Sequence, residues 1–357
     1  MFKRKTTLIV GAGASAEYRL PVGDGLKDVI ADALYEIGKP GSPGREEQRS
    51  SANADPVLLQ AIQARGNERG SMEYEAIAHG MSDGIRHASS IDRYLHLHRD
   101  NQAAVDIGKI AISRRILAAE QNSLLGADRL DLTAIKQGNA NGPHWLNELF
   151  VRLQDDAPLE KIEQVFSNLT IITFNYDRVI EHYLFHALRA LGNLDQEDAA
   201  RAMSHLKIVH PYGKIGRLPW QPDDGTPDLP FGEHLRLRHE ALVASAQRLR
   251  TFTETVEDGE VLAAIHNGIV EANQLVFMGF SFLPQNLELM KGDRRTKATT
   301  IEATSFGESE SNIGIARMHI ARMARGPEKP QVFDHDVAWT PLKAGDYLRQ
   351  NGNRLAS

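Results

Sequence analysis

The sequence predicts an α/β fold, in which helices flank a Rossmann-like parallel sheet and a large helical insertion or second domain is added. Three observations lead to this fold class. The apolar β-type run 7–10 breaks directly into glycines, which is typical of a strand that enters a tight turn. From residue 169 onward, β-type runs alternate with helical stretches, and this alternation indicates a parallel sheet covered by helices. Between these regions, residues 57–166 have helical periodicity throughout and contain no β-type run.

The further strands are predicted from short apolar runs. They are expected at 169–174, 206–209 and 274–278, with two later candidates at 299–304 and 331–339. Helices are expected where apolar residues recur at three- and four-residue spacing, at 26–37, 178–191, 258–272 and 311–324. Asp24 stands where it would cap the first of these helices, because a carboxylate there accepts backbone N–H groups.

The length of 357 residues exceeds what one hydrophobic core usually supports, so more than one structural unit is expected. We expect a discontinuous Rossmann-like domain, a helical insertion, a flexible loop and a C-terminal tail. Their boundaries are 1–37 with 167–345 for the domain, 57–166 for the insertion, 38–56 for the loop and 346–357 for the tail. The loop is rich in Gly, Pro and Ser, which favour irregular backbone.

Composition limits the classes of function. The chain is 41% hydrophobic and 25% charged with a net charge of -6, and this charge argues against a nucleic-acid-binding surface as the main function. It contains no cysteine, which excludes disulfides, a cysteine nucleophile and a thiolate zinc site. No apolar run is long enough to span a membrane, and the charged residues 3–5 do not begin a signal peptide. We expect a cytoplasmic protein that contacts neither nucleic acid nor membrane directly.

The first glycine turn matches the spacing G-x-G-x-x-A of a dinucleotide-binding fingerprint at Gly11, Gly13 and Ala16. Glycines let a backbone approach a phosphate closely, and a turn before a helix presents several N–H donors to it. The residues expected to bind the cofactor here are Gly11, Ala12, Gly13, Ala14 and Ser15. Pro21 interrupts any long helix after this turn, and no strand that ends in an acidic residue follows, so the dehydrogenase pattern is not met. An ordinary tight turn of an α/β protein is the alternative.

Polar residues follow the other strands as well. In an open parallel sheet, ligands bind beyond the carboxyl ends of the strands, so residues at these ends are expected to converge. The second strand ends near Thr173 and is followed by Asn175 and Asp177, the third is followed by His210, and the fourth by Gly279 and Ser281. An amide, a carboxyl and an imidazole that meet a glycine turn indicate a site for a nucleotide ligand.

Four motifs carry a family resemblance: Gly-Ala-Gly-Ala-Ser at 11–15, Thr-Phe-Asn-Tyr-Asp at 173–177, His-Pro-Tyr-Gly at 210–213 and Gly-Phe-Ser at 279–281. In this order they resemble the sirtuin-like NAD-consuming superfamily, and most closely its bacterial anti-phage defence effectors, which lack the zinc ribbon. The resemblance implies that NAD is the substrate, that no metal takes part, and that the nicotinamide–ribose bond is hydrolysed to nicotinamide and ADP-ribose. It also implies a homo-oligomer that an ATPase or sensor protein of the same defence system activates.

Two departures from the sirtuin pattern bear on the reaction. Deacylating sirtuins carry a four-cysteine zinc ribbon, and this chain has no cysteine. Pro211 and Tyr212 also separate His210 from Gly213, where sirtuins have His and Gly in sequence. Protein deacylation or ADP-ribosyl transfer is therefore the less favoured use of the same chemistry. A sensor that binds NAD or ADP-ribose without turnover is the third hypothesis.

The expected roles of the residues follow from the bond that breaks. Its cleavage builds positive charge on the ribose, so the site needs an oriented ribose and a group that activates water. Asn175 can hold a water or a ribose hydroxyl because an amide both donates and accepts, and His210 suits a general base because an imidazole titrates near neutrality. Asp177 either favours the developing cation or caps the next helix. By resemblance, the cofactor site is completed by Pro21, Thr173, Gly279 and Ser281.

Overall fold

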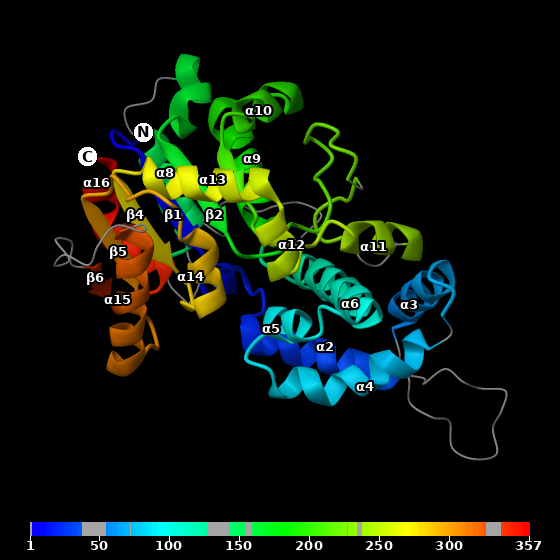
Figure 1. The fold of residues 1–357 in the computed structure, drawn as a ribbon. Helices are drawn as coiled ribbons and strands as arrows, with labels where there is room; N and C mark the ends of the chain where they lie inside the picture. Colours follow the sequence, from blue (N-terminus) through cyan, green and yellow to red (C-terminus); the bar gives the residue numbers. More distant parts are fainter. Residues whose placement is uncertain are drawn as a thin grey trace, which may run out of the picture.

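The computed structural model describes residues 2–37, 55–71, 73–126, 143–154, 159–226, 228–233, 238–325 and 337–357. Within them, a six-stranded sheet has the order β3-β2-β1-β4-β5-β6, and every neighbouring pair of strands is parallel. The strands are β1 (Thr6–Val10), β2 (Leu169–Thr173), β3 (Lys207–Val209), β4 (Gln274–Met278), β5 (Thr300–Thr304) and β6 (Val337–Thr340). This is the strand order of the doubly wound Rossmann fold, so the predicted fold class is confirmed (Figure 1).

Helices make up most of the rest of the described chain. The α-helices are α1 (Ala12–Ser15), α2 (Gly23–Ile37), α3 (Pro56–Glu68), α4 (Tyr74–His87), α5 (Ile91–Leu97), α6 (Gln102–Gln121), α8 (Trp145–Gln154), α9 (Val179–Gly192), α10 (Gln196–Met203), α11 (His239–Ala246), α12 (Phe252–Glu257), α13 (Gly259–Val270), α14 (Pro284–Met290), α15 (Glu310–Arg325) and α16 (Ala344–Ala356). The 3-10 helices are η1 (Ala16–Tyr18) and η2 (Leu159–Phe166). In the described part of the chain, no helix combines the length and apolar character that a membrane span requires.

The elements predicted from the sequence fall on those of the structure, with a few differences at their ends. The candidate strand 331–339 is matched by β6 from Val337 onward, and residues 331–336 lie outside the described part. Asp24 was predicted to cap a helix, but it lies inside the first turn of α2, which already begins at Gly23. Of the predicted loop 38–56, residues 38–54 lie outside the described part. The residues of the predicted tail 346–357 form most of α16.

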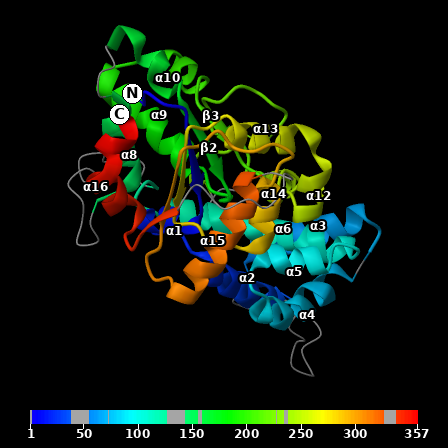
Figure 2. The same ribbon diagram turned by 60° about the vertical axis from the view of Figure 1, so that its left-hand side comes forward.

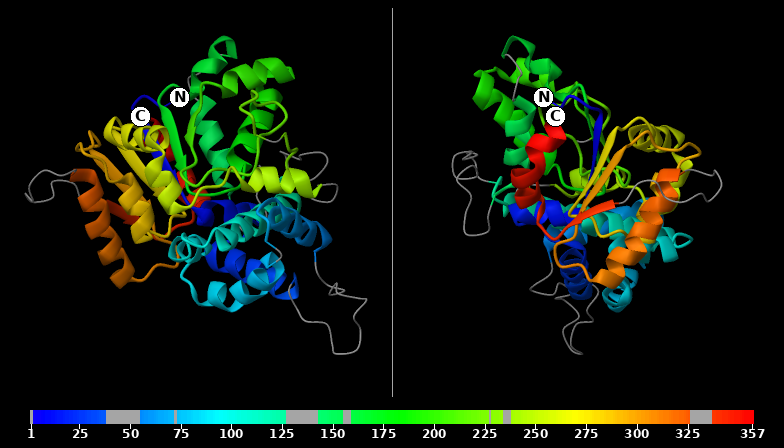
Figure 3. Two further views of the ribbon diagram at one scale, coloured as in Figure 1. Left: turned by 45° about the vertical axis from the view of Figure 1, so that its right-hand side comes forward. Right: turned by 90° about the vertical axis from the view of Figure 1, so that its left-hand side faces the viewer.

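Helices cover both faces of the sheet. Alternate side chains of a strand point to opposite faces, so Leu8 and Val10 of β1 lie in one core cluster and Ile9 lies in the other. Helices α8, α9 and α16 pack on the first face and α13, α14 and α15 on the second (Figure 2 and Figure 3). The two chain ends meet where the Lys3 N–H donates to the Ala356 carbonyl at 3.2 Å.

A further group of helices, α2 to α6, gathers beside the sheet (Figure 1). Helix α2 packs along α4, and both contact α6. Helix α8 instead packs on α16, and its Trp145 and Leu149 are fully buried in the core cluster of the first sheet face. Contacts therefore cross the predicted boundary of the helical insertion in both directions: α2 joins the helices of the insertion, and α8 joins the sheet.

Candidate functional site

A cavity of about 640 Å³ lies at the carboxyl ends of the central strands. The strand order reverses between β1 and β4, and such a switch point is where open α/β sheets bind their ligands. We call this space the switch-point cavity. The residues that line it include Gly11, Ala12, Gly13 and Glu17 from the β1 turn, Phe174 and Asn175 after β2, Gly279 and Ser281 after β4, Thr304 and Phe306 from the end of β5, and Ser90 and Asp92 beside α5.

The predicted site residues divide into two groups around this cavity. Those that line it are Gly11, Ala12, Gly13, Asn175, Gly279 and Ser281. Those that do not are Ala14, Ser15, Pro21, Thr173, Asp177 and His210. Pro21 is followed by Val22 and Gly23, which do line the cavity. Six of the predicted residues therefore line one cavity at the carboxyl edge of the sheet. Of the others, Ser15, Thr173 and His210 are hydrogen-bonded to Asn175.

The glycines of the two turns pack directly against each other. The Gly13 N–H donates to the Gly279 carbonyl at 2.9 Å, and the Gly11 N–H donates to the Met278 carbonyl at 3.1 Å. A Cβ on Gly11 would lie 2.5 Å from the Gly279 carbonyl oxygen. Gly279 itself has a φ of 56°, and a Cβ there would overlap the Ala14 nitrogen. This close approach of two backbones requires glycine at all three positions, whether or not a phosphate binds.

The same packing uses two of the backbone donors that were predicted for a pyrophosphate. The Gly13 N–H is bonded to Gly279, and the Ala14 N–H donates to the Gly11 carbonyl at 3.0 Å. Among the described residues, the Ala12 N–H has no acceptor, and Ala12 lines the cavity. The turn therefore offers fewer free donors to an anion than its sequence predicts.

Asn175 is the residue that joins the β2 end to the β1 turn. Its amide Nδ2 donates to the Gly11 carbonyl at 3.2 Å and to the Ser15 hydroxyl at 2.8 Å. Its backbone N–H donates to the Thr173 Oγ1 at 3.3 Å, which holds the residue at the strand end. Since both amide hydrogens are used inside the protein, the side-chain oxygen Oδ1 of Asn175 is the group left to accept a hydrogen bond in the cavity.

Asp177 stabilises the start of helix α9, whose N-cap residue is Arg178. Its Oδ1 accepts the Val179 N–H at 3.1 Å, and its side chain is also hydrogen-bonded to Ser15. Burial and the charges of Glu120 and Glu181 raise the pKa of Asp177 to about 7, although its two donors oppose the rise. Of the two roles predicted for Asp177, the one at the helix start is the one that its contacts support.

His210 lies behind Asn175 and not on the cavity wall. Its Nδ1 lies 3.1 Å from the backbone carbonyl oxygen of Asn175, and its Nε2 lies 3.1 Å from Glu181 Oε1. Both neighbours accept hydrogen bonds, so each ring nitrogen of His210 faces an acceptor. Lys214 Nζ also donates to Glu181 Oε1 at 3.1 Å. Burial raises the pKa of Glu181, but the charges of Lys214 and His210 outweigh it and hold that pKa well below its usual range.

A buried ion pair fixes the chain directly after Asp177. The side chains of Arg178 and Glu120 are both fully buried, and Arg178 Nη2 lies 2.5 Å from Glu120 Oε2. Arg178 Nη1 also donates to the Leu229 carbonyl at 2.6 Å, and Glu120 Oε2 accepts the Gly232 N–H at 3.1 Å. Helix α6 is thereby fastened to the start of α9, and the motif around Asn175 is held from both sides.

Two carboxyl groups on the cavity wall are missed by the sequence argument. Asp92 of α5 accepts a hydrogen bond from the Tyr176 hydroxyl, and burial raises its pKa, although the Tyr176 hydroxyl lowers it. Glu17 accepts the backbone N–H groups of Trp145 at 2.9 Å and Gly345 at 2.8 Å. Burial raises the pKa of Glu17 to about 7 in spite of these donors. Ser90-Ile91-Asp92 has the pattern of a helix start, and nothing local in it indicates nearness to the sheet.

Aromatic side chains form another part of the wall. Phe174, Tyr212 and Phe280 line the cavity, and the rings of Phe174 and Phe280 meet edge to face with centroids 5.2 Å apart. The Tyr212 hydroxyl donates to Asn286 Oδ1 at 2.7 Å. This wall offers aromatic, largely apolar surface to a ligand ring, beside the polar group of Asn175.

The fold and this cavity define a Rossmann-like α/β protein with a ligand cavity at the switch point of its sheet. No protein-family model matches the chain, and no curated protein is significantly similar to it. Within the described ranges, no group of three or more His, Asp or Glu side chains is arranged to hold a metal ion.

Proposed function

We propose that the switch-point cavity binds NAD and that the protein hydrolyses its nicotinamide–ribose bond, as an NAD glycohydrolase does. The observation that carries the proposal is the Asn175 amide, which two hydrogen bonds hold at the mouth of the glycine turn. The size of the cavity supports it as well, because about 640 Å³ is within the usual range for cofactor sites.

Cleavage fits these residues better than hydride transfer. Dinucleotide-dependent dehydrogenases of this fold place an acidic side chain at the end of β2, where it binds the ribose hydroxyls. Here Asn175 follows β2 and lines the cavity, while Asp177 accepts the Val179 N–H at the start of α9 and does not line it. An amide oxygen at this place can orient a water or a ribose hydroxyl without carrying a charge of its own.

The proposed reaction breaks the bond between the ribose C1′ and the nicotinamide nitrogen. Nicotinamide leaves with the bonding electron pair as a neutral ring, and positive charge develops on the ribose. A water held by the Asn175 Oδ1 attacks C1′, and its proton passes to the carboxylate of Asp92, which lines the same cavity. Because burial raises the pKa of Asp92, its carboxylate is a stronger base than an ordinary aspartate. His210 acts as a positioning residue in this scheme, because it bonds the Asn175 carbonyl and Glu181.

The test follows free nicotinamide after NAD is added to the purified full-length chain. Asp92→Asn should lower kcat about 100-fold or more, since a general base contributes roughly that much. Asp83→Asn is the matched control on the exposed side of α4 and should leave kcat unchanged. If Asp92→Asn releases nicotinamide as fast as the wild type does, Asp92 is not the general base.

His210 needs a separate readout because its role is indirect. His210→Gln keeps a donor for the Asn175 carbonyl, so it should retain more activity than His210→Ala and alter the pH profile less. Equal loss in the two variants, with the acidic limb of the pH profile abolished, would favour His210 as the general base that the sequence predicts. An added acylated peptide tests deacylation, and ADP-ribose binding without any release of nicotinamide would favour a sensor.

The wider role is proposed from the sirtuin-like resemblance. It comprises an anti-phage defence effector that depletes NAD in the cytoplasm, a homo-oligomer, and activation by an ATPase or sensor protein of the same system. Size-exclusion chromatography coupled to light scattering tests the oligomer directly. A monomer at micromolar concentration, both with and without NAD, would contradict that part of the proposal.

A further inference from the structure

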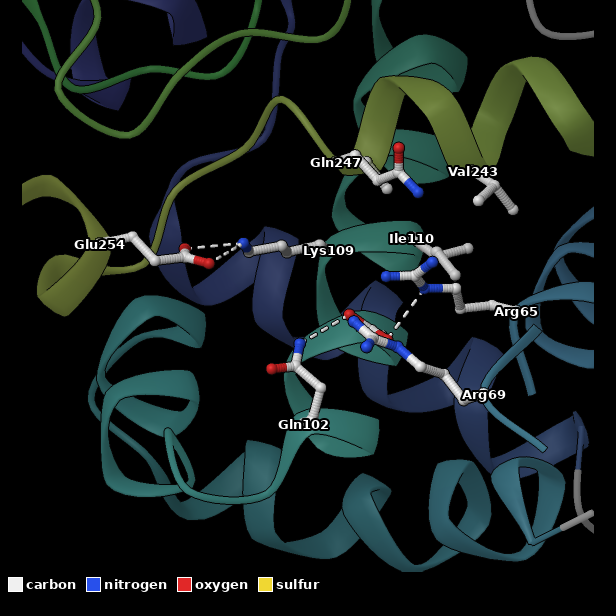
Figure 4. A pocket seen from close by; sticks show the side chains of 10 residues that line it. Arg65, Arg69, Gln102, Lys109, Ile110, Val243, Gln247 and Glu254 are labelled. Carbon is white, nitrogen blue, oxygen red and sulfur yellow. Dashed lines mark hydrogen bonds and ion pairs between the residues drawn. The ribbon is translucent and has the colours of Figure 1, made fainter. Parts of the chain in front are cut away.

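A second cavity lies between α3, α6, α11 and α12 and shares no lining residue with the switch-point cavity (Figure 4). Its volume is about 260 Å³, which suits a ligand smaller than a dinucleotide. The residues that line it are Arg65, Arg69, Gln102, Asp106, Lys109, Ile110, Val243, Ala246, Gln247 and Glu254. We call it the interhelix cavity.

Asp106 is the residue to which several of the polar side chains around this cavity are hydrogen-bonded. It is buried, and its Oδ2 accepts hydrogen bonds from Arg65 Nε at 2.9 Å, Arg69 Nε at 3.3 Å and the Tyr74 hydroxyl at 3.2 Å. Its Oδ1 accepts from Gln102 Nε2 at 2.8 Å. Asp106 therefore accepts four hydrogen bonds from the protein, three of them on Oδ2. Its charge is paired with two guanidinium groups, which it orients.

The other carboxylate of the cavity is also satisfied. Lys109 Nζ lies 2.7 Å from each of the two Glu254 oxygens. Glu254 Oε2 accepts in addition the Thr251 N–H at 2.6 Å, as part of the capping box that starts α12. Neither acid of this cavity therefore remains to attract a cation.

Several donors, in contrast, have no acceptor among the described residues. Arg69 is bonded to Asp106 through Nε, which leaves both of its Nη groups unused. Arg65 uses Nε for Asp106 and Nη1 for Glu68, which leaves Nη2. The side-chain amide of Gln247 also has no partner in the described chain. In Figure 4, Arg65 of α3 and Arg69, directly after α3, reach in from one side, with Lys109 on the opposite side and Gln247 above.

We propose that the interhelix cavity binds a small phosphomonoester. A site whose carboxylates are ion-paired with protein cations, and whose guanidinium groups keep unused donors, selects a ligand group that accepts hydrogen bonds. Charge-assisted bonds to a phosphate are among the strongest available. The donors come from two arginines, so they approach from two directions. A tetrahedral phosphate can accept from both, whereas one guanidinium fork already satisfies a planar carboxylate. The apolar side chains of Ile110 and Val243 offer a surface to the carbon part of the ligand.

The test measures binding by calorimetry at low ionic strength, because salt screens exposed charges. The probes are ribose 5-phosphate, inorganic phosphate and acetate, added separately to the full chain. Ribose 5-phosphate and phosphate should bind, and acetate should bind at least tenfold more weakly. Equal affinity for acetate and phosphate, or no binding of ribose 5-phosphate at millimolar concentration, would overturn the proposal.

Two kinds of variant distinguish which of the two cavities binds the phosphate. Arg69→Gln should weaken binding of ribose 5-phosphate at least tenfold, and it is tolerable for the fold because that side chain is 44% exposed. Arg86→Gln, which removes an exposed ion pair of α4 with Asp32, is the matched control and should leave affinity within twofold. Binding that is unchanged in Arg69→Gln but lost in Asn175→Ala would put the phosphate in the switch-point cavity and contradict the proposal.

Discussion

The Asn175 Nδ2 lies 2.8 Å from the Ser15 hydroxyl, so two motifs that are 160 positions apart in the sequence form one buried hydrogen bond. Ser15 is in turn bonded to Asp177. The three side chains form a chain of hydrogen bonds behind the switch-point cavity, and this chain sets the direction of the Asn175 amide. The glycine turn and the segment after β2 therefore depend on each other for their geometry.

Removal of the central hydroxyl should destabilise the protein. Ser15→Ala leaves the Asn175 amide with one acceptor and takes a donor from the buried Asp177, at a cost of about 1–3 kcal/mol in the free energy of unfolding. Urea denaturation measures this loss. Ser204→Ala is the control, because its exposed hydroxyl is bonded to the Arg201 carbonyl and its loss should cost less than about 0.5 kcal/mol. Equal urea midpoints for the two variants would show that the buried hydrogen bonds of Ser15 add nothing to the free energy of unfolding.

Gly279 should tolerate no side chain. Gly279→Ala adds a Cβ that overlaps the Ala14 nitrogen at a φ of 56°, so left-handed strain and steric overlap together should cost about 2–5 kcal/mol. Gly307→Ala is the matched control, because its φ of 79° gives similar strain while no heavy atom lies within 4 Å of the new Cβ. Thermal denaturation of both variants separates strain from overlap. If the two variants lose similar amounts of thermal stability, the overlap with Ala14 costs little, and the turn at Gly279 must move away from the β1 turn easily.

The buried Arg178–Glu120 pair should be far more sensitive than a surface pair. Glu120→Gln leaves the Arg178 charge fully buried without its counter-charge, which should cost about 3–5 kcal/mol. Glu163→Gln breaks the exposed pair with Arg201 and should leave the urea midpoint nearly unchanged, because water screens this pair. The comparison is made from urea midpoints at one pH. A loss below about 1 kcal/mol in Glu120→Gln would mean that water reaches the Arg178 side chain.

Asp177 should make stability fall as pH rises through the acidic range. Its pKa is raised from an ordinary 3.8 to about 7, so the folded protein holds this proton more tightly than the unfolded chain does. Its contribution to stability is complete below the unfolded pKa and is lost progressively as pH rises toward about 7. Asp177→Asn cannot titrate and keeps the oxygen that accepts the Val179 N–H.

The corresponding measurement compares urea midpoints of wild type and Asp177→Asn across the range from about pH 4 to about pH 7. The wild-type midpoint should fall more steeply than that of the variant. Part of the fall should persist in the variant, because the pKa of Glu17 is raised in the same direction, to about 7. Parallel curves would contradict the raised pKa of Asp177.

The general architecture could be predicted because it depends on local patterns. Apolar runs marked the strands, and the rule that ligands bind at the carboxyl ends of strands brought Gly11, Asn175 and Ser281 to one cavity. The fold class needed no more than the alternation of strands and helices. Asn175 was identified for the same reason, since it directly follows a strand.

The remaining features depend on contacts that no local pattern records. The partner of His210 is Glu181, a residue on helix α9, which comes earlier in the chain, and the bond turns a predicted base into a group engaged on both nitrogens. Asp92 reaches the cavity because α5 crosses beside the strand ends, and α5 comes from a region with no sheet pattern of its own. The glycine spacing was also ambiguous, because close packing on Gly279 explains it as well as a phosphate does.

In the proposed reaction, the Asn175 side chain orients the attacking water in the switch-point cavity, and release of nicotinamide measures whether it does. Purified wild-type chain and Asn175→Ala are incubated with NAD, with circular dichroism as the check that both are folded. We expect equal amounts of nicotinamide and ADP-ribose from the wild type and a rate about 100-fold lower from Asn175→Ala. Equal rates in the two proteins, or no nicotinamide from the wild type while the dinucleotide binds, would contradict it.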